Sequence, residues 1–193
     1  SNLNSSGNVE INTIAFDQTL VSNFTLNSDK TIIVSSTKTL TIDSGVILTN
    51  NGTIIINNGF IVDQNTDTNK GLQNNGTLDN SGNILTNTSI SVSSGYAINT
   101  IAIDQTLVSN FTLNSDKTIT VNSTKTLTID SGVILTNNGF IVDKNTDTTK
   151  GLQNNGTLTN NGNILSNSSN LNSSGNVEIN TIAFDQTLVS NFT

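Results

Sequence analysis

The chain has 193 residues, of which Asn, Ser and Thr supply 35, 23 and 31, and its formal net charge is −7. Cys, His, Met, Pro and Trp are absent and all seven basic residues are Lys, which excludes a disulfide framework, a Cys/His metal site and a Ser-His or Cys-His nucleophile pair. The low positive charge argues against nucleic acid as a partner, and no apolar run approaches the ~20 residues that membrane insertion of a helix requires.

Long-range repetition organises the chain. Residues 1–25 recur without a change as residues 169–193, at an offset of 168. Inside this period, residues 12–48 match residues 99–135 at an offset of 87, and residues 64–85 match residues 144–165 at an offset of 80. The offset falls by seven because the first copy contains an additional strand-and-turn segment around residues 52–58. Self-similarity of this kind is typical of a solenoid or an array.

The repeats divide one continuous solenoid, residues 1–193, into a first copy (1–87), a second copy (88–168) and the start of a third (169–193). Because Thr193 copies Thr25, which lies within a copy, we expect a window from a longer array with a 168-residue period. A terminal extension of 25 residues is the alternative.

A finer period begins at Lys38, where the chain reads KTLTIDS, GVILTNN, GTIIINN, GFIVD. Each seven-residue unit is a short Thr/Ile/Val-rich stretch followed by a polar corner, and Asn and Gly suit corners that enter the left-handed region. Short strands and corners at a constant interval predict an all-β parallel β-solenoid, or β-helix, built from tandem repeats. Three seven-residue sides give 21 residues per rung, hence about eight rungs per 168 residues, rising roughly 40 Å.

An inward column of aliphatic residues would hold such rungs together, each fully buried side chain contributing about 1.5–3 kcal/mol. The Thr residues of the TLT stretches (Thr39 and Thr41, Thr126 and Thr128) suit the outer face, and the exchange of Ile33 for Thr120 places that position outward. Stacked Asn residues at the corners are expected to form hydrogen-bonded ladders. The predicted core residues are Leu40, Ile42, Ile47, Ile54, Ile61, Leu72, Leu78, Ile84, Leu127, Ile129, Ile134, Ile141, Leu152, Leu158 and Ile164.

The segment TLTIDSGVILTNNGTIIINNG resembles the Asn-Gly-rich repeats of large bacterial surface adhesins and fibre proteins with parallel β-helix stalks. The resemblance covers residues 39–58 well, residues 126–138 in shortened form, and residues 71–84 and 151–164 more loosely. Similar repeats occur in viral and phage fibres. The resemblance implies an extracellular, elongated structural role and transfers no binding residue, because these repeats have no fixed one.

The recurring DQNTD and DKNTD segments are the candidate metal site. Asp63, Asn65 and Asp67, repeated as Asp143, Asn145 and Asp147, have the D-x-N-x-D spacing of a calcium loop. Thr68 and Thr148 stand where such a loop has Gly, and no bidentate carboxylate follows. We therefore favour a solvated polar loop in which Lys70 or Lys150 offsets the charge, and expect no metal and no cofactor.

Paired carboxylates for glycoside hydrolysis are the enzymatic alternative. Asp17, Asp29 and Asp43 recur with the repeat, and a catalytic site duplicated in every copy is a poor explanation of residues that are common at corners. We expect a structural protein and not an enzyme: a repeat of a fibre or stalk on a cell or virion surface, partnering with itself end to end. The alternative is a surface adhesin that binds glycans or a host surface through Thr/Asn-rich faces.

Overall fold

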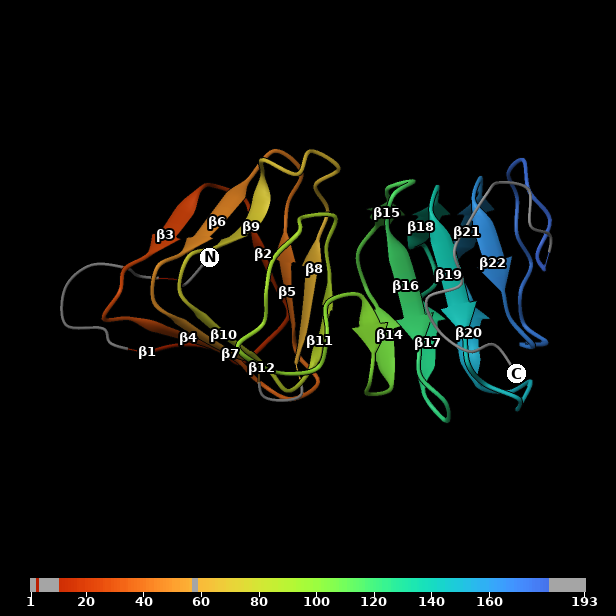
Figure 1. The fold of residues 1–193 in the computed structure, drawn as a ribbon, viewed down its shortest axis with the longest axis horizontal. Coiled ribbons are helices and arrows are strands. Elements are labelled where there is room, and N and C mark those ends of the chain that lie inside the picture. Colours follow the sequence, from red (N-terminus) through yellow and green to blue (C-terminus); the bar gives the residue numbers. More distant parts are fainter. Residues whose placement is uncertain (1–2, 4–10, 57–58, 181–193) are drawn as a thin grey trace. The chain divides into compact units, whose positions relative to one another are not determined.

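The computed structural model describes residue 3, residues 11–56 and residues 59–180. Every strand in this part of the chain pairs in parallel with its neighbours, which confirms the predicted all-β solenoid. The chain divides into two compact units, Ser1–Ile98 (unit 1) and Asn99–Thr193 (unit 2). In each unit, short strands joined by corners stack into successive coils (Figure 1). The predicted continuity of one solenoid over residues 1–193, and its division at residues 87 and 168, stay predictions.

Unit 1 is three-sided. Its strands are β1 (Ile11–Ile14), β2 (Gln18–Leu20), β3 (Phe24–Leu26), β4 (Thr31–Val34), β5 (Thr39–Ile42), β6 (Ile47–Asn50), β7 (Thr53–Ile56), β8 (Phe60–Asp63), β9 (Gly71–Asn74), β10 (Thr77–Asn80), β11 (Asn83–Leu85) and β12 (Ser94–Gly95). The three sheets have the orders β1-β4-β7-β10-β12, β2-β5-β8-β11 and β3-β6-β9. Consecutive strands therefore lie on different sides. As far as β11 each strand pairs with the third strand after it, whereas β12 pairs with β10.

Unit 2 repeats this plan with fewer strands. They are β13 (Thr100–Ile101), β14 (Gln105–Leu107), β15 (Phe111–Leu113), β16 (Thr118–Val121), β17 (Thr126–Ile129), β18 (Ile134–Asn137), β19 (Phe140–Asp143), β20 (Gly151–Asn154), β21 (Thr157–Asn160) and β22 (Asn163–Leu165). The sheets have the orders β13-β16-β19-β22, β14-β17-β20 and β15-β18-β21. An isolated parallel bridge from Thr159 to Ser174 continues the last of these sheets.

The rungs vary in length around the 21 residues predicted, and most of them are longer. Ile11 pairs with Thr31, an interval of 20 (31 − 11), and Thr126 pairs with Gly151, an interval of 25 (151 − 126). The described residues make about seven turns, against the predicted eight per 168 residues. The corners account for the difference, above all the loop between β8 and β9, which has no counterpart in a uniform seven-residue side.

The seven-residue segment of the first copy forms β7 and sets the register of everything after it. In unit 1, β4 pairs with β7, and the TLTI sequence of β5 pairs with the FIVD sequence of β8. In unit 2, which lacks this segment, FIVD in β19 pairs with β16, and TLTI in β17 pairs with GLQN in β20. Loss of one side therefore moves the following chain round by one side while the stacking persists.

Aliphatic columns fill both units. All the predicted core residues are buried except two: Ile47 is half-buried and Ile134 is 42% exposed. Strands β6 and β18 begin at these residues, so alternation along the strand turns the adjacent Leu48 and Leu135 inward instead. Columns run through paired strands, for example Leu40, Ile61 and Ile84 in unit 1 and Ile119, Ile141 and Ile164 in unit 2.

The outer face follows the prediction in part. Ile33 lies on it, half-buried, between the fully buried Ile32 and Val34. Thr39 and Thr41 alternate with inward residues as predicted, yet they are only 2% and 5% exposed. Their neighbours in the ladder are Phe60 and Val62, whereas the half-exposed Thr126 and Thr128 adjoin Gly151 and Gln153. The rotated register thus places bulkier side chains beside one copy of the same threonines.

Partly buried apolar side chains add to the core of unit 1. Leu3, Ile90, Val92 and Ile98 are partly buried and pack against the aliphatic cluster. No helix in the described ranges is long and apolar enough to span a membrane.

Candidate functional site

The candidate calcium segment begins with a buried carboxylate at the end of β8. Asp63 is fully buried, and its Oδ1 accepts hydrogen bonds from the backbone N–H of Asn65 (3.1 Å) and from Asn65 Nδ2 (2.8 Å). Its Oδ2 accepts from the backbone N–H of Leu72 (3.0 Å) and from the Thr86 hydroxyl (2.8 Å). Both carboxylate oxygens are therefore occupied by donors from the protein itself.

Asn65 connects this carboxylate to the preceding rung. Its Nδ2 also donates to the carbonyls of Asp43 (3.1 Å) and Val46 (3.2 Å), and its Oδ1 accepts from the N–H of Gly45 (2.7 Å). Asp63 and Asn65 together, which we call the corner staple of unit 1, join three successive rungs. Gly71 is required beside it, because φ is +73° there and a Cβ would collide with the Asp63 carboxylate.

Unit 2 contains a second corner staple, formed by Asp143 and Asn145. Asp143 Oδ1 accepts from the N–H (3.0 Å) and Nδ2 (2.6 Å) of Asn145, and Oδ2 accepts from the N–H of Leu152 (3.2 Å) and the Ser166 hydroxyl (2.6 Å). Asn145 Nδ2 donates further to the carbonyls of Asn122 and Lys125, both at 3.1 Å. The corner staple is thus retained in unit 2 although a different corner of the preceding rung lies beside it.

The third member of each D-x-N-x-D segment does not join the other two. Asp67 is exposed and accepts from the N–H of Asn69 (3.0 Å), and Asp147 accepts from the N–H and hydroxyl of Thr149 (both 2.8 Å). Among the described residues, no group of three acidic, His or Cys side chains is placed to hold a metal ion. The favoured interpretation as a solvated polar loop is wrong for the first half of each segment, because Asp63, Asn65 and their copies are buried.

Asparagine ladders connect the other corners, as predicted. Pairs join at the strand ends, where Asn50 Nδ2 donates to the half-buried Asn74 Oδ1 (2.7 Å) and Asn137 Nδ2 donates to the buried Asn160 Oδ1 (2.8 Å). More accessible pairs form at the following asparagines: Asn75 with Asn51 and Asn170 with Asn155 are exposed, and Asn161 with Asn138 is partly buried. The ladders run in the same direction as the backbone hydrogen bonds between rungs and reinforce them.

Several corner glycines serve close approach and not left-handed backbone, contrary to the prediction. Gly52 has no positive φ, and a Cβ on it would collide with the carbonyl oxygens of Asn27 and Lys30. Left-handed backbone occurs, as predicted for Gly and Asn, at Gly45 (φ +83°), Gly132 (φ +80°), Asn99 (φ +58°) and Asn180 (φ +61°). It also occurs at Thr37 (φ +63°) and Thr124 (φ +66°). A β-branched residue is unfavourable in this region, so the two threonine corners carry backbone strain.

Two buried amide oxygens in the described part of the chain have no hydrogen-bond partner: Asn80 Oδ1 and Asn145 Oδ1. Asn80 pairs with Ile56 of the additional strand β7, whereas its copy Asn160 pairs with Asn137 and accepts its amide. Asn145 lies beside the corner that contains Thr124, whereas its copy Asn65 accepts from Gly45. Each unsatisfied oxygen therefore follows from the one-side rotation between the copies.

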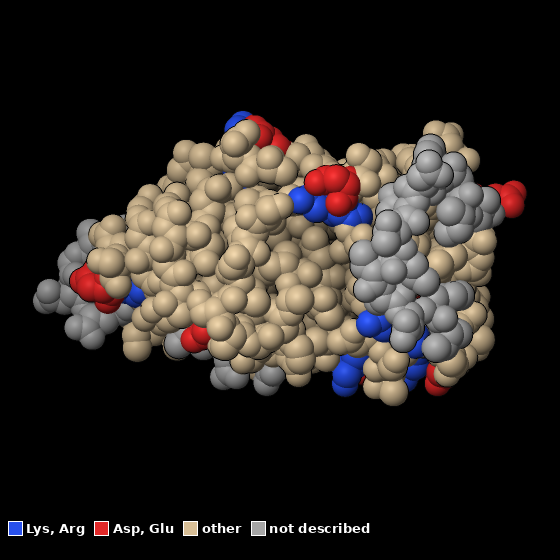
Figure 2. All heavy atoms as spheres, viewed as in Figure 1, with Lys and Arg blue, Asp and Glu red and all other residues tan. Residues whose placement is uncertain are grey.

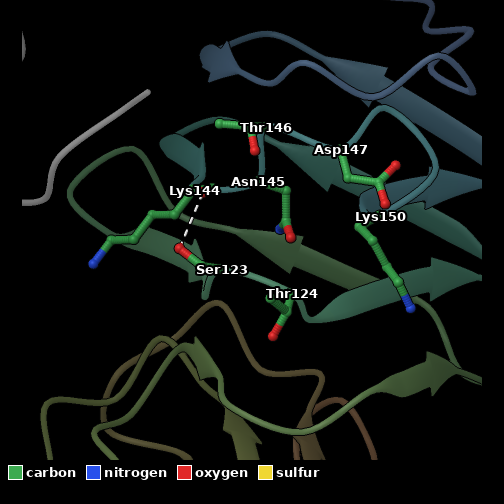
Figure 3. Close-up of a pocket in the computed structure, with 7 residues that line it drawn as sticks. All are labelled: Ser123, Thr124, Lys144, Asn145, Thr146, Asp147 and Lys150. Atoms are coloured by element: carbon green, nitrogen blue, oxygen red, sulfur yellow. Dashed lines mark hydrogen bonds between the residues drawn. The ribbon is translucent and has the colours of Figure 1, made fainter.

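A cavity of about 210 Å³, lined in part by Asn145, lies within unit 2. It lies between the corner at Ser123 and Thr124 and the loop of residues 144–147, and Lys150 also lines it. In Figure 3 the Asn145 amide occupies the centre of the lining side chains and points toward Thr124. The Ser123 hydroxyl donates to the Lys144 carbonyl at 3.1 Å, which connects the two walls of the cavity.

Charge around the cavity is mixed. The backbone hydrogen bond from Thr149, and then its hydroxyl, holds the pKa of Asp147 below its ordinary value, so this carboxylate is ionised at neutral pH. Lys144 and Lys150 supply two positive charges, and their ammonium groups extend to opposite sides of Asn145 (Figure 3). Over the face drawn in Figure 2, uncharged residues predominate and the Lys and Asp/Glu side chains lie in small groups.

The remaining repeated acids act within corners. Asp17 Oδ1 accepts from the N–H of Thr39 (2.8 Å), and Asp43 Oδ1 accepts from the N–H of Ser44 (2.8 Å). Asp29 forms an ion pair with Lys30 (3.1 Å), whose hydrogen bond lowers the pKa of that carboxyl. Sequence reasoning missed the corner staples. The constant interval from the acid to Gly71 and from its copy to Gly151 is the signal that could have revealed them.

Comparisons of the chain with known protein families, with curated proteins and with solved structures found no match. The parallel β-solenoid and its internal repeat are therefore established by the molecule itself.

Proposed function

We propose that this chain is a structural repeat of an extracellular β-solenoid fibre or stalk that extends by stacking copies of itself end to end. The observation that carries this proposal is the dual register of the repeat. The same TLTI and FIVD sequences stack on different neighbours in the two units, and the inward aliphatic columns continue in both. A rung that accepts more than one neighbour can be added repeatedly without a new interface, which suits an elongated array.

Polar bonding between rungs supports a mechanical role. Corner staples, asparagine ladders and backbone ladders all connect one rung to the next, so load along the axis is shared among many bonds. Parallel edge strands can also accept a further strand by hydrogen bonding. Fibre assembly, the location on a cell or virion surface and the absence of enzymatic activity belong to this proposal.

Electron microscopy of chains that contain two or more 168-residue periods tests it. We expect unbranched filaments, and about seven turns at ~4.8 Å each give an axial repeat of roughly 34 Å per period. A matched chain in which Leu72 and Leu152 are replaced by Asp should give no filaments, because both residues are fully buried in the columns. Compact particles that do not lengthen with the number of periods would contradict the proposal.

A second candidate function, adhesion to glycans, is favoured by the hydroxyl- and amide-lined cavity of unit 2. A glycan array probed with the whole chain tests it. Binding to a defined set of glycans would support it, and a blank array would leave the fibre role alone.

A further inference from the structure

We propose that copies of this chain join by exchanging a rung: a second copy supplies its residues 179–193 to the position beside β4, β5 and β6 that residues 11–25 occupy. The inference names the contact between copies in the fibre proposal and rests on that proposal. Three observations carry it: the two segments are identical in sequence, β1, β2 and β3 are edge strands, and their rung has an apolar outer surface.

The pairing of the first rung of unit 1 (β1–β3) defines what a replacement must supply. β1 pairs with β4, β2 with β5 and β3 with β6, and each of the first three strands is the edge of its sheet in the described part of the chain. Ile14 and Leu20 point inward from β1 and β2 and are 1% exposed. A replacement must therefore offer three strands in this order with aliphatic residues at both inward positions.

Two corner side chains add a further requirement. Asp17 Oδ1 accepts a hydrogen bond from the N–H of Thr39 (2.8 Å), and Asn23 Oδ1 accepts from the N–H of Ile47 (2.9 Å). Both acceptors bond backbone donors where β5 and β6 begin. Acceptors at these two positions hold the first rung in register with the second.

Residues 179–193 repeat residues 11–25 without a change. They therefore carry all four groups that the position requires, at the same spacing: Ile182, Asp185, Leu188 and Asn191. Since identical groups make identical contacts, the segment of a second chain can bind beside β4, β5 and β6 as the chain's own segment does. Exchange of an identical element between copies requires no new interface.

The donating chain already holds the beginning of this repeat on unit 2. The N–H of Asn180 donates to the Ile164 carbonyl (2.7 Å), and the N–H of Ser174 donates to the Leu158 carbonyl (2.8 Å). Asn180 has left-handed backbone (φ +61°), as has Asn99 (φ +58°), after which the chain enters β13. β13, β14 and β15 pair with β16, β17 and β18 as β1, β2 and β3 pair with β4, β5 and β6. The proposed junction thus repeats, between two chains, a coil and rung that each chain contains once.

The outer surface of the first rung favours a second copy as the occupant. Ile11, Phe16 and Val21 are 56%, 60% and 65% exposed, the highest values of any large hydrophobic side chain in the described residues. Ile179, the copy of Ile11, is half-buried at the end of the coil on unit 2. A segment from a second copy arrives with that coil attached, so one segment serves two edges and apolar surface leaves water.

Mixed single-cysteine chains test the exchange, because the natural chain has no Cys. Thr19 and Thr41 are partners in β2 and β5, and Thr187 is the copy of Thr19. Full-length Thr41→Cys and Thr187→Cys chains are mixed under mild oxidation, and linked peptides are identified by mass spectrometry. We expect a disulfide between positions 41 and 187 of different chains, with a yield that rises with protein concentration.

Thr128→Cys is the matched control for the acceptor. Thr128 is the copy of Thr41 in unit 2, and its partner Thr106 belongs to a segment that continues into described chain at both ends. Mixing Thr128→Cys with Thr187→Cys should give no link above background. Equal links at positions 41 and 128, or no link at position 41, overturn the exchange.

Two donor variants test the contact itself. Leu188→Asp, added to the Thr187→Cys chain, alters the copy of the buried Leu20 and should lower the yield by at least about tenfold. Val189→Asp alters the copy of the exposed Val21 and should leave the yield unchanged. Equal yields from these two variants overturn the register.

The exchange and the fibre proposal fail separately. Unbranched filaments without a link between positions 41 and 187 would leave the fibre and remove the exchange. The same link in chains that form no filaments would leave the exchange and remove the fibre.

Discussion

The two units have similar sequences, but unit 1 contains seven residues that unit 2 lacks. As a result, corresponding strands stack on different neighbours in the two units. In unit 1 the FIVD strand β8 pairs with the TLTI strand β5, and in unit 2 the FIVD strand β19 pairs with the TITV strand β16. The apolar columns form with either pairing, because the inward side chain of Leu40 beside Ile61 is similar to that of Ile119 beside Ile141. Dispersion and hydrophobic burial are non-directional, so an aliphatic side chain packs against either neighbour.

The bonding of polar groups does depend on which strands pair, because a hydrogen bond requires a specific partner at a specific position. Among the residues that the structure describes, one buried amide oxygen in each unit lacks a partner: Asn80 in unit 1 and Asn145 in unit 2. The copies of both residues, Asn160 and Asn65, are fully bonded on that atom. The comparison therefore separates what permits the solenoid, an exchangeable core, from what specifies its register, the polar corners.

The largest effect is expected from deleting residues 53–59, which gives unit 1 the connection found in unit 2. FIVD should then pair with residues 31–34 instead of 39–42, and every later strand of unit 1 should move round by one side. Cysteine pairs report the register because the natural chain has no Cys. Thr41→Cys with Val62→Cys should form a disulfide only in the full-length chain, where these residues are partners, and Ile33→Cys with Val62→Cys only in the deletion variant. The same pair closing in both chains would contradict the rotation.

The corner staples should contribute equally to the two units, since both retain four hydrogen bonds to the carboxylate. We expect Asp63→Asn and Asp143→Asn each to lower the free energy of unfolding by about 3 kcal/mol, because an amide cannot accept from all four donors and these bonds involve a charged group. Urea unfolding measures the loss. Asp67→Asn, in the exposed part of the same loop, is the control and should change stability little. A loss no greater than that of the control would show that the buried carboxylate is not a fastening point.

The left-handed threonine corner offers a smaller and sharper test. Thr124→Gly removes the same backbone strain as Thr37→Gly, and it also gives this corner the residue found in unit 1, where the N–H of Gly45 donates to Asn65 Oδ1. We therefore expect Thr124→Gly to stabilise the chain by about 1 kcal/mol more than Thr37→Gly, the net worth of one hydrogen bond. Thermal and urea unfolding compare the two. Equal changes would mean that the unpaired oxygen of Asn145 carries no cost in solution.

The sequence predicts the fold well because its two signals, the 168-residue repeat and the short aliphatic stretches, both depend on properties that each strand carries alone. Leu40 or Ile84 is apolar and inward whichever strand lies beside it. Ile47 and Ile134 were misplaced because the seven-residue count was carried through corners whose length varies. The exposure of Thr39 against Thr126 could not be predicted, since it is set by the ladder neighbour and hence by the rotation.

The candidate site was harder to predict from the sequence than the fold, because its hydrogen bonds also depend on which strands pair. The D-x-N-x-D spacing identified the correct residues but the wrong chemistry: Asp143 and Asn145 turn inward to bind the corner while Asp147 stays outside. Locally, the loop around Asn145 differs from the loop around Asn65 only at Lys144, which replaces Gln64, and at Thr149, which replaces Asn69. Their different hydrogen bonding arises from the corner about 20 residues earlier in the chain, which contains Thr124 in unit 2 and Gly45 in unit 1. Which corner lies there depends on whether the seven-residue segment is present.

The smallest expected effect concerns the exposed ends of the two loops, where Thr149 in unit 2 replaces Asn69 of unit 1. Hydrogen bonds from the N–H and hydroxyl of Thr149 lower the pKa of Asp147 below its ordinary value of 3.8. A carboxyl with a lowered pKa in the folded state contributes stability that is fully present above its ordinary value and is lost as the pH falls through the lowered value. Asp147→Asn lacks this contribution.

The difference in Tm between the natural chain and Asp147→Asn should therefore be constant at neutral pH and vanish in strong acid, when followed from about pH 6 to about pH 2. Thr149→Val removes the hydroxyl but keeps the backbone donor, so it should retain the larger part of the difference. A difference that persists unchanged at the acid end would place the effect of Asp147→Asn outside its charge, in the shape of the loop that borders the cavity.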